Sequence, residues 1–234
     1  FIGNSGLVGP TGQIRARKER VIDFRGGRGR GNTTQVWTHH SFPAKSTLNK
    51  RSPIDRDSIE RLREAAAENS SSTFLLKRRL IMILLLEMTG CRRAELVSIT
   101  IKSVKAALQM KVPSLRVLSV KRGGNRTGER LIRMRREVIE FVDEYIRINR
   151  RPLIRATCGS NDDDGFLFVN ARTGKQLTAE YIGCELYKLR RLAGLEGRAH
   201  AHMFRHRFIT MQFVRMIEQH NFENEDEFRK ALIN

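Results

Sequence analysis

Apolar and polar positions repeat along the chain with two different periods, and the change of period separates its elements. From Pro53 onward, apolar residues recur every three or four positions, as in a helix with one buried face. The first such stripe follows a helix start at Pro53 and Asp55 and consists of Ile59, Leu62, Ala65 and Ala66. Residues 73–88 are apolar on most sides and predict the central buried helix, which Gly90 ends. A short third helix follows, with Ala94, Leu96 and Val97 predicted to face inward.

The middle of the chain predicts strands. Residues 115–120 and 130–134 are rich in residues that favour strands, and residues 121–129 supply turn residues between them, which predicts a β-hairpin with a mobile tip. Helices are predicted again over 138–146, over 178–193 before a capping Gly194, and from near His202 onward, with a short strand at 166–169. We therefore expect an α/β fold that is mainly α, with helices around a small antiparallel hairpin or three-stranded sheet.

Residues 1–50 differ from the rest. They contain eight glycines between Gly3 and Gly31, and nine basic residues against two acidic ones. Such a segment buries too little apolar surface to offset its ordering entropy, which predicts a basic, glycine-rich flexible segment. It could lie along a phosphate backbone or be a plain solvated linker. Residues 51–234 are predicted to form one folded domain.

The composition of the chain indicates a class of binding partner. The formal net charge is +19, from 44 Lys and Arg against 25 Asp and Glu, which favours a polyanion, with nucleic acid ahead of an anionic membrane. The longest apolar run, residues 80–86, is far shorter than the roughly 20 residues that span a bilayer. Three cysteines without C-x-x-C spacing indicate free thiols in a reducing compartment, without a zinc site or disulfide framework.

Three short stretches carry candidate chemistry: residues 89–96, 120–124 and 202–206. Each alone has a plain explanation, as a solvated arginine pair, a polar hairpin tip, or a satisfied histidine pair. His202 and His206 have the spacing of half a metal site, but no Glu follows His202 as a zincin requires, so no metal is predicted.

Taken in order, the three stretches suit phosphoryl transfer without a metal. Two permanently charged guanidinium groups can clamp the non-bridging oxygens of a phosphodiester, where charge accumulates during attack. A lysine on a hairpin tip could protonate the departing 5′ oxygen, and a histidine could handle the proton of the nucleophile. No cofactor is implied.

These residues resemble a family, the tyrosine recombinases or phage integrases. Residues 89–96, Thr-Gly-Cys-Arg-x-x-Glu-Leu, look like the family's first arginine motif, and residues 202–206, His-x-x-Arg-His, look like its second. Val120-Lys121 with the glycine-rich turn is similar to the hairpin that bears its catalytic lysine. The resemblance covers residues 52–217 and implies a tyrosine recombinase-like catalytic domain.

The resemblance also implies roles. Arg92 and Arg205 would bind the scissile phosphate, Lys121 would be the general acid and His202 the acid–base partner, with Glu95 steadying the first motif. Arg93 is expected to contact the DNA backbone rather than the scissile phosphate. The other predicted DNA contacts are Arg122, Arg126 and Arg130.

The sequence departs from the family pattern at the nucleophile. All three tyrosines, Tyr145, Tyr181 and Tyr187, precede His202, and no Gly-His turn follows Arg205. Packing explains Tyr181 and Tyr187 better than catalysis. We expect the nucleophile to lie beyond Asn234, which would leave the printed sequence inactive as it stands. The alternative is a relative that has lost catalysis.

The implied activity is site-specific recombination or integration, in which DNA strands are cleaved and rejoined through a 3′-phosphotyrosyl intermediate. The rivals are a type IB topoisomerase and a catalytically inactive DNA-binding relative. Double-stranded DNA is the expected partner, with a homo-oligomer on DNA, a synaptic tetramer by resemblance. The expected location is the cytoplasm, in association with the nucleoid, with no membrane contact. The expected origin is bacterial or phage, in a mobile genetic element.

Overall fold

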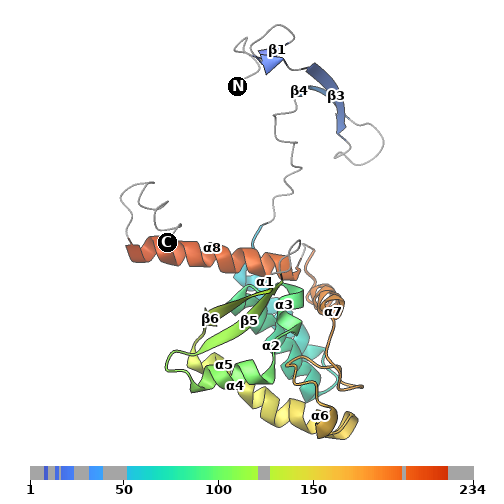
Figure 1. The fold of residues 1–234 in the computed structure, drawn as a ribbon. Helices are drawn as coiled ribbons and strands as arrows, with labels where there is room; N and C mark the ends of the chain where they lie inside the picture. The colour runs from blue at the N-terminus through green and yellow to red at the C-terminus, as the bar shows by residue number, and fades with distance from the viewer. Residues whose placement is uncertain are drawn as a thin grey trace. The chain divides into compact units, whose positions relative to one another are not determined.

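A computed structural model describes residues 52–120, 127–196 and 199–220, and the backbone of four short strands within residues 1–50. The chain divides into two compact units, residues 1–50 and 51–234 (Figure 1). All three stretches that carry candidate chemistry belong to the second unit.

The first unit contains two strand pairs. β1 (Val8–Gly9) pairs in parallel with β2 (Ile14–Arg15), and β3 (Arg17–Asp23) pairs antiparallel with β4 (Asn32–Thr38). No element was expected in this stretch, which was interpreted as flexible. Valine, threonine and tryptophan in β4 are residue types that favour strands, and they are the signal for this hairpin in the sequence.

The second unit begins with α1 (Arg56–Glu68), and this helix confirms the first apolar stripe. The side chain of Asp55 accepts a hydrogen bond from the Ser58 amide at 2.6 Å and caps the helix. The stripe that this helix buries is the predicted one, namely Ile59, Leu62, Ala65 and Ala66.

The central helix is α2 (Thr73–Thr89), which ends at Gly90 with φ of 56°. Its two middle arginines are buried, although the sequence pattern placed them among the few polar positions of the helix. Arg78 donates to the Val169 carbonyl and the Tyr181 hydroxyl, both at 2.8 Å. Arg79 donates through Nε to Glu185 Oε1 at 2.6 Å. Buried charges need such partners, and these contacts tie α2 to α7 (Ala179–Leu192).

The next two helices are α3 (Arg93–Val97) and α4 (Ile101–Gln109). In α3, the prediction that Ala94 faces inward is wrong, because Ala94 is exposed and Glu95 is fully buried instead. The Glu95 carboxylate can be buried because Arg92 and Arg130 both form ion pairs with it. α4 was not predicted, although Val104 and Ala107 have helical spacing and are buried.

The predicted hairpin is confirmed by β5 (Ser114–Val120) and β6 (Thr127–Arg133), with Ser114 opposite Arg133 and Val120 opposite Thr127. The predicted strand at 166–169 is wrong. Phe166 and Val169 each form only one isolated bridge, to Thr100 and to Gln176. Leu167 and Phe168 are fully buried, so the apolar signal came from core packing rather than from strand pairing. The sheet in the described part of this unit therefore has two strands.

The remaining elements are helical. α5 (Arg136–Tyr145) continues through a π-helical turn (Ile146–Arg150) into α6 (Arg151–Thr157), and a short 3-10 turn (Ser160–Asp162) follows. α7 and the long α8 (Ala201–His220) complete the unit, as the pattern predicts.

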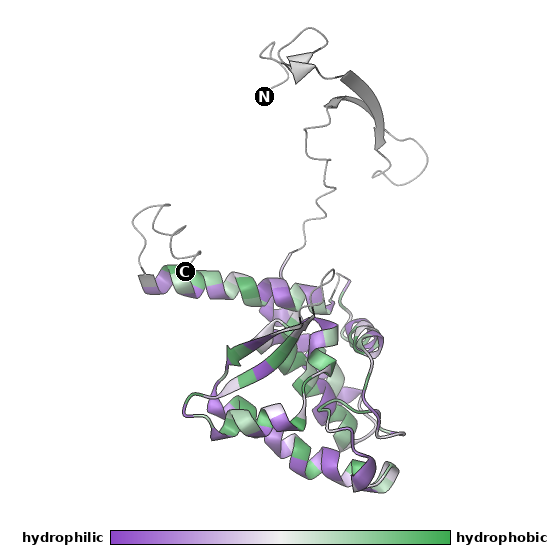
Figure 2. Ribbon diagram, in the orientation of Figure 1, coloured by the Kyte–Doolittle hydropathy of each residue, from purple (hydrophilic) through white to green (hydrophobic). Residues whose placement is uncertain are grey.

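Most helices have one polar and one apolar face, whereas α2 is apolar along much of its length (Figure 2). No helix among the described residues is long and apolar enough to cross a membrane.

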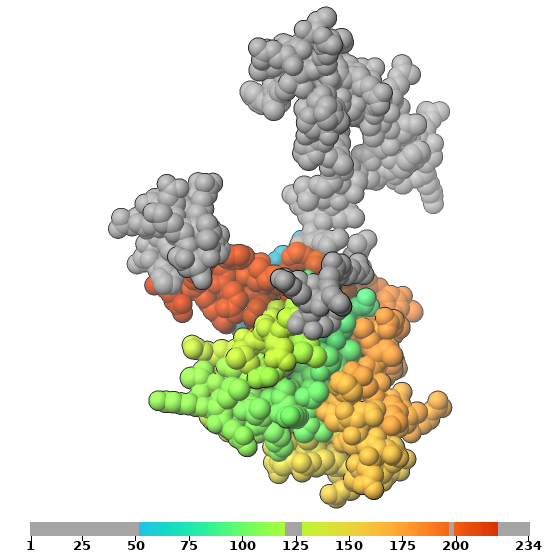
Figure 3. All heavy atoms as spheres, viewed as in Figure 1, coloured from blue at the N-terminus to red at the C-terminus, as the bar shows by residue number. Residues whose placement is uncertain are grey.

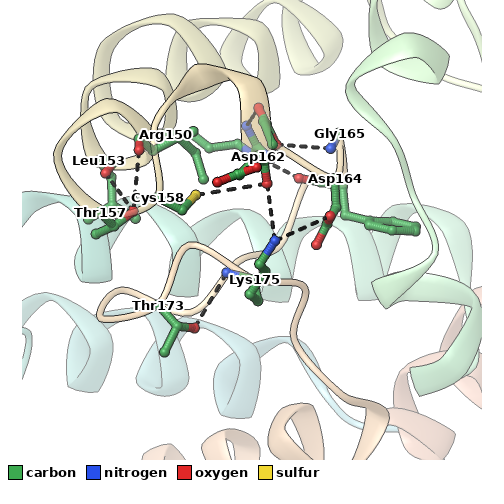
Figure 4. Close-up of polar contacts among 12 residues, drawn as sticks. Arg150, Leu153, Thr157, Cys158, Asp162, Asp164, Gly165, Thr173 and Lys175 are labelled. Carbon is green, nitrogen blue, oxygen red and sulfur yellow. Dashed lines mark hydrogen bonds and ion pairs between the residues drawn. The ribbon is translucent and has the colours of Figure 1, made fainter.

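A buried ion pair fixes the turn after α6. Arg150 is fully buried and donates to both carboxylate oxygens of Asp163, at 2.7 and 2.5 Å. Nearby, Lys175 Nζ lies 3.2 Å from the Asp162 carbonyl and 3.6 Å from the Asp164 carboxylate (Figure 4). The hydrogen bonds from Arg150 lower the pKa of Asp163. These contacts place the chain that leads into α7.

Asp163→Asn is expected to lower the free energy of unfolding at neutral pH by on the order of 3 kcal/mol, because it leaves Arg150 buried without a counter-charge. The folded-state pKa is depressed, so this stabilisation is present above the ordinary Asp value of 3.8 and is lost as pH falls through the folded pKa. Urea unfolding at several pH values should therefore show wild type and variant converging in acid. A constant difference down to the lowest pH would contradict this.

Candidate active site

Residues from three elements line one solvent-open pocket of about 520 Å³, which we call the phosphate pocket. The turn between α2 and α3 contributes Arg92, and α8 contributes Arg205 and His202. The remaining lining residues are Cys91, Arg93, Ala94, Ala179, Glu180 and Ala201. Three of the four predicted catalytic residues therefore come together. α8 and the β5–β6 hairpin also lie side by side in the space-filling view (Figure 3).

Arg92 is positioned by its own helix start. Its backbone amide donates to Glu95 Oε2 at 3.0 Å, and its guanidinium Nη1 donates to Glu95 Oε1 at 2.8 Å. Glu95 has no solvent exposure, whereas half of the Arg92 side chain is exposed. The buried carboxylate thus holds the arginine from behind, and the remaining guanidinium edge faces the pocket.

Arg205 is positioned by the end of α2. Its Nη1 donates to the Gly90 carbonyl at 3.0 Å, a contact between residues 115 positions apart in sequence. A Cβ at Gly90 would lie 2.7 Å from Phe208 Cδ1, so glycine is required for close approach of α8 as well as for its positive φ. Burial, followed by the nearby charges of Arg92 and Arg130, lowers the pKa of Arg205. Like charges gathered in this way favour a bound anion.

Arg130 on β6 is a second ion-pair partner of Glu95, a structural role that sequence reasoning missed. Its Nη2 donates to Glu95 Oε2 at 2.9 Å and lies 3.7 Å from Cys91 Sγ. Glu95 is therefore shared by two arginines. Burial raises the pKa of the Cys91 thiol, which favours the neutral thiol beside this cluster. Only an i, i+3 spacing linked Glu95 to Arg92 in sequence, and nothing local linked it to Arg130.

The two histidines lie one turn apart on α8. His202 is exposed at the pocket, and its ring meets that of His206 edge-on at 4.4 Å between centroids. His206 Nε2 is buried without a hydrogen-bond partner among the described residues. No group of three or more potential metal-ligating side chains occurs in the described ranges.

The hairpin tip falls outside the described residues, and with it Lys121, Arg122 and Arg126. Their predicted roles stay predictions. Arg93 is exposed and borders the phosphate pocket.

None of the three tyrosines lines the phosphate pocket. Tyr145 is in the core, and burial raises the pKa of its hydroxyl. The Tyr181 hydroxyl accepts a hydrogen bond from Arg78. Tyr187 is 54% exposed on α7. The described residues thus bring two guanidinium groups and a histidine to one pocket, with no tyrosine beside them.

Residues 53–218 match the model of the phage integrase family. The chain belongs to that family. The match spans well over half of the sequence and contains both arginine motifs, so the resemblance predicted from them is confirmed. No curated protein matches the chain.

Solved structures of recombinases share the integrase fold of this chain. XerA recombinase superposes with a TM-score of 0.50 at 22% identity, over 68% of this chain and 49% of that one. XerH site-specific recombinase is similar in two complexes. The pre-cleavage complex with difH gives a TM-score of 0.51 at 21% identity, over 73% of this chain and 44% of that one. The post-cleavage complex with palindromic difH gives a TM-score of 0.53 at 20% identity, over 76% of this chain and 46% of that one. The chain spans about half the length of these proteins, and the likeness confirms the mainly helical fold with its small sheet.

Proposed function

We propose that this integrase-family chain binds double-stranded DNA and carries the phosphate-activating groups of a site-specific recombinase. The full reaction would cleave and rejoin strands through a 3′-phosphotyrosyl intermediate. The observation that carries the proposal is the convergence of Arg92 and Arg205 on one open pocket, each held from behind by an acceptor.

The arrangement suits the charge that develops on a phosphodiester. Two guanidinium groups can each donate to a non-bridging oxygen, where negative charge grows as a nucleophile attacks phosphorus. Because the acceptors already orient both side chains, little reorganisation is needed during the reaction.

Proton transfer completes the proposal. His202 at the pocket is the proposed acid–base partner, and Lys121 is the proposed general acid for the departing 5′ oxygen. Arg93, Arg122 and Arg126 are proposed backbone contacts. Arg130 is a proposed contact whose guanidinium Glu95 already engages.

The proposal also includes the assembly and the location of the protein. The protein, of bacterial or phage origin, would act in the cytoplasm, in association with the nucleoid, as a homo-oligomer on DNA and a tetramer at synapsis. XerH was solved bound to its difH substrate, which supports DNA as the partner of this chain too.

Supercoiled plasmid offers a test that does not require the target site, because any nick relaxes it. Hydrogen peroxide, with a chelator to suppress metal-driven damage, supplies a small nucleophile to an open pocket. Attack on phosphorus would break the P–O5′ bond, and the 5′ oxygen would leave as a hydroxyl after gaining a proton. We expect nicks that polynucleotide kinase can label without prior phosphatase treatment.

The matched control is the chain with both Arg92→Ala and Arg205→Ala, which should bind plasmid but nick it no faster than peroxide alone. Nicks bearing 5′ phosphates would contradict the proposed chemistry. Tight DNA binding without any protein-dependent nicking would favour a catalytically inactive DNA-binding relative.

DNA affinity itself should depend steeply on salt, because the net charge of +19 must displace counterions from phosphates. Each neutralised phosphate contributes about 0.9 to the slope of log affinity against log salt, so a slope of about −4 or steeper is expected. Fluorescence anisotropy with a labelled duplex measures it. A flat dependence would count against DNA as the partner.

A further inference from the structure

A second concavity of about 580 Å³ adjoins the phosphate pocket, and no step proposed above uses it. This side hollow lies between α7 and the start of α8. It shares Arg93, Glu180, Ala201 and His202 with the phosphate pocket, so the two hollows have a common wall. The side chains that belong to the side hollow alone are Gly183, Cys184, Tyr187, Arg190, Ala199 and His200.

The Arg93 side chain lies against α7 at this common wall, at a position where α7 has a glycine. A Cβ at Gly183 would lie only 2.4 Å from Arg93 Nη1, so the guanidinium rests directly on the backbone of α7. Arg93 takes part in no hydrogen bond or ion pair within the described part of the chain. A guanidinium group with no hydrogen-bond or ion-pair partner among the described residues is free to bind a phosphate.

Tyr187 provides a flat apolar surface in the same hollow. Tyr187 is 54% exposed, and the Arg190 guanidinium lies over its ring, 5.0 Å from the ring centroid. Three small residues, Gly183, Ala199 and Ala201, also line the hollow, which has a volume of about 580 Å³. An aromatic face beside cationic groups is a common platform for a nucleic-acid base.

The geometry points to a binding site for one unstacked nucleotide of the DNA substrate, with its phosphate on Arg93 and its base against Tyr187. This inference rests on the proposed function, because the common wall puts that nucleotide next to the phosphate held by Arg92 and Arg205. The Glu180 carboxylate on the wall can accept a hydrogen bond from a base amino group. An uncharged peptide would use the aromatic ring but would leave Arg93 without an anion, so the nucleotide fits better.

Removing a base from the stack costs a few kcal/mol, and less when the base is already unpaired. A duplex with one bulged nucleotide should therefore bind more tightly than the same duplex fully paired. We expect a preference of about tenfold, within the range of base–aromatic stacking. Anisotropy titrations at constant salt, with bulges placed at several positions, measure this ratio.

Two variants test the site without changing Arg92 or Arg205. Tyr187→Ala should abolish the bulge preference and leave affinity for the paired duplex nearly unchanged. Gly183→Ala should displace Arg93 and reduce the preference while leaving Tyr187 in place. Phe213→Ala is the matched control, because Phe213 is an aromatic residue of α8 that is 40% exposed outside the hollow.

Each outcome bears on one claim. Absence of a bulge preference, or a preference that survives Tyr187→Ala, overturns the side hollow as a nucleotide site. A Tyr187-dependent preference in a chain that fails the plasmid nicking test would retain the nucleotide site and reject the proposed cleavage chemistry. If Phe213→Ala lost the bulge preference as fully as Tyr187→Ala, the effect would not be specific to the side hollow. That result would also overturn the side hollow as a nucleotide site.

Discussion

Arg205→Ala is expected to lower the rate of peroxide-dependent plasmid nicking by two to three orders of magnitude, the largest effect on activity in this protein. Loss of one donor aimed at a developing oxyanion has this typical magnitude. The Gly90 carbonyl orients Arg205, and Phe208, three residues farther along α8, packs against Gly90. The nicking rate at saturating protein isolates this loss from any change in affinity.

The control for this prediction lies on the same helix. Arg215 is exposed on α8, and it lines a different groove from the phosphate pocket. Arg215→Ala removes the same charge, so it should weaken binding slightly and leave the nicking rate at saturation unchanged. If the two variants nick at the same rate, Arg205 has no special role and the assignment of the phosphate pocket is wrong.

Glu95→Gln is expected to lower the free energy of unfolding by about 2 to 3 kcal/mol, the largest effect on stability among the residues of the candidate site. Removing one member of a buried ion pair typically costs about 3–5 kcal/mol. The arginine side chains are 50% and 29% exposed, so water compensates part of that loss. Glutamine preserves the shape of the side chain, which makes charge the variable. Chemical denaturation monitored by circular dichroism gives the difference.

Glu129→Gln is the matched control. Glu129 also pairs with an arginine, Arg116, but both side chains are half exposed or more. A surface pair of this kind contributes less than about 1 kcal/mol. In addition, Arg130→Gln combined with Glu95→Gln should recover part of the loss, because it removes one of the unpaired charges. Equal effects of Glu95→Gln and Glu129→Gln would contradict the proposed role of the buried carboxylate.

Local patterns were sufficient for most elements of the fold. Short stretches of sequence were enough to predict the apolar stripe of α1, the apolar length of α2, the turn of the hairpin and the cap at Gly90. The predicted strand at 166–169 failed because Leu167 and Phe168 are apolar for burial in the core. Without a neighbouring strand, an apolar run does not form a sheet.

The candidate site divides in the same way. The types and order of its residues, Arg92, Lys121, His202 and Arg205, are fixed by sequence, and so is the strong positive charge that favours DNA. Glu95 was singled out as a supporting residue, but its complete burial could not be foreseen. Burial of a carboxylate depends on which cations surround it, and Arg130 reaches it from a strand 35 positions away.

By itself, then, the sequence determined which groups this protein can use and that a phosphate-rich partner suits them. Only the tertiary structure decided where those groups lie. α8 must pack against the end of α2 for Arg205 to reach the Gly90 carbonyl, and α7 must present Gly183 for Arg93 to rest beside the phosphate pocket. Contacts between residues so distant in the chain depend on the packing of whole helices, which no local pattern of apolar and polar positions encodes.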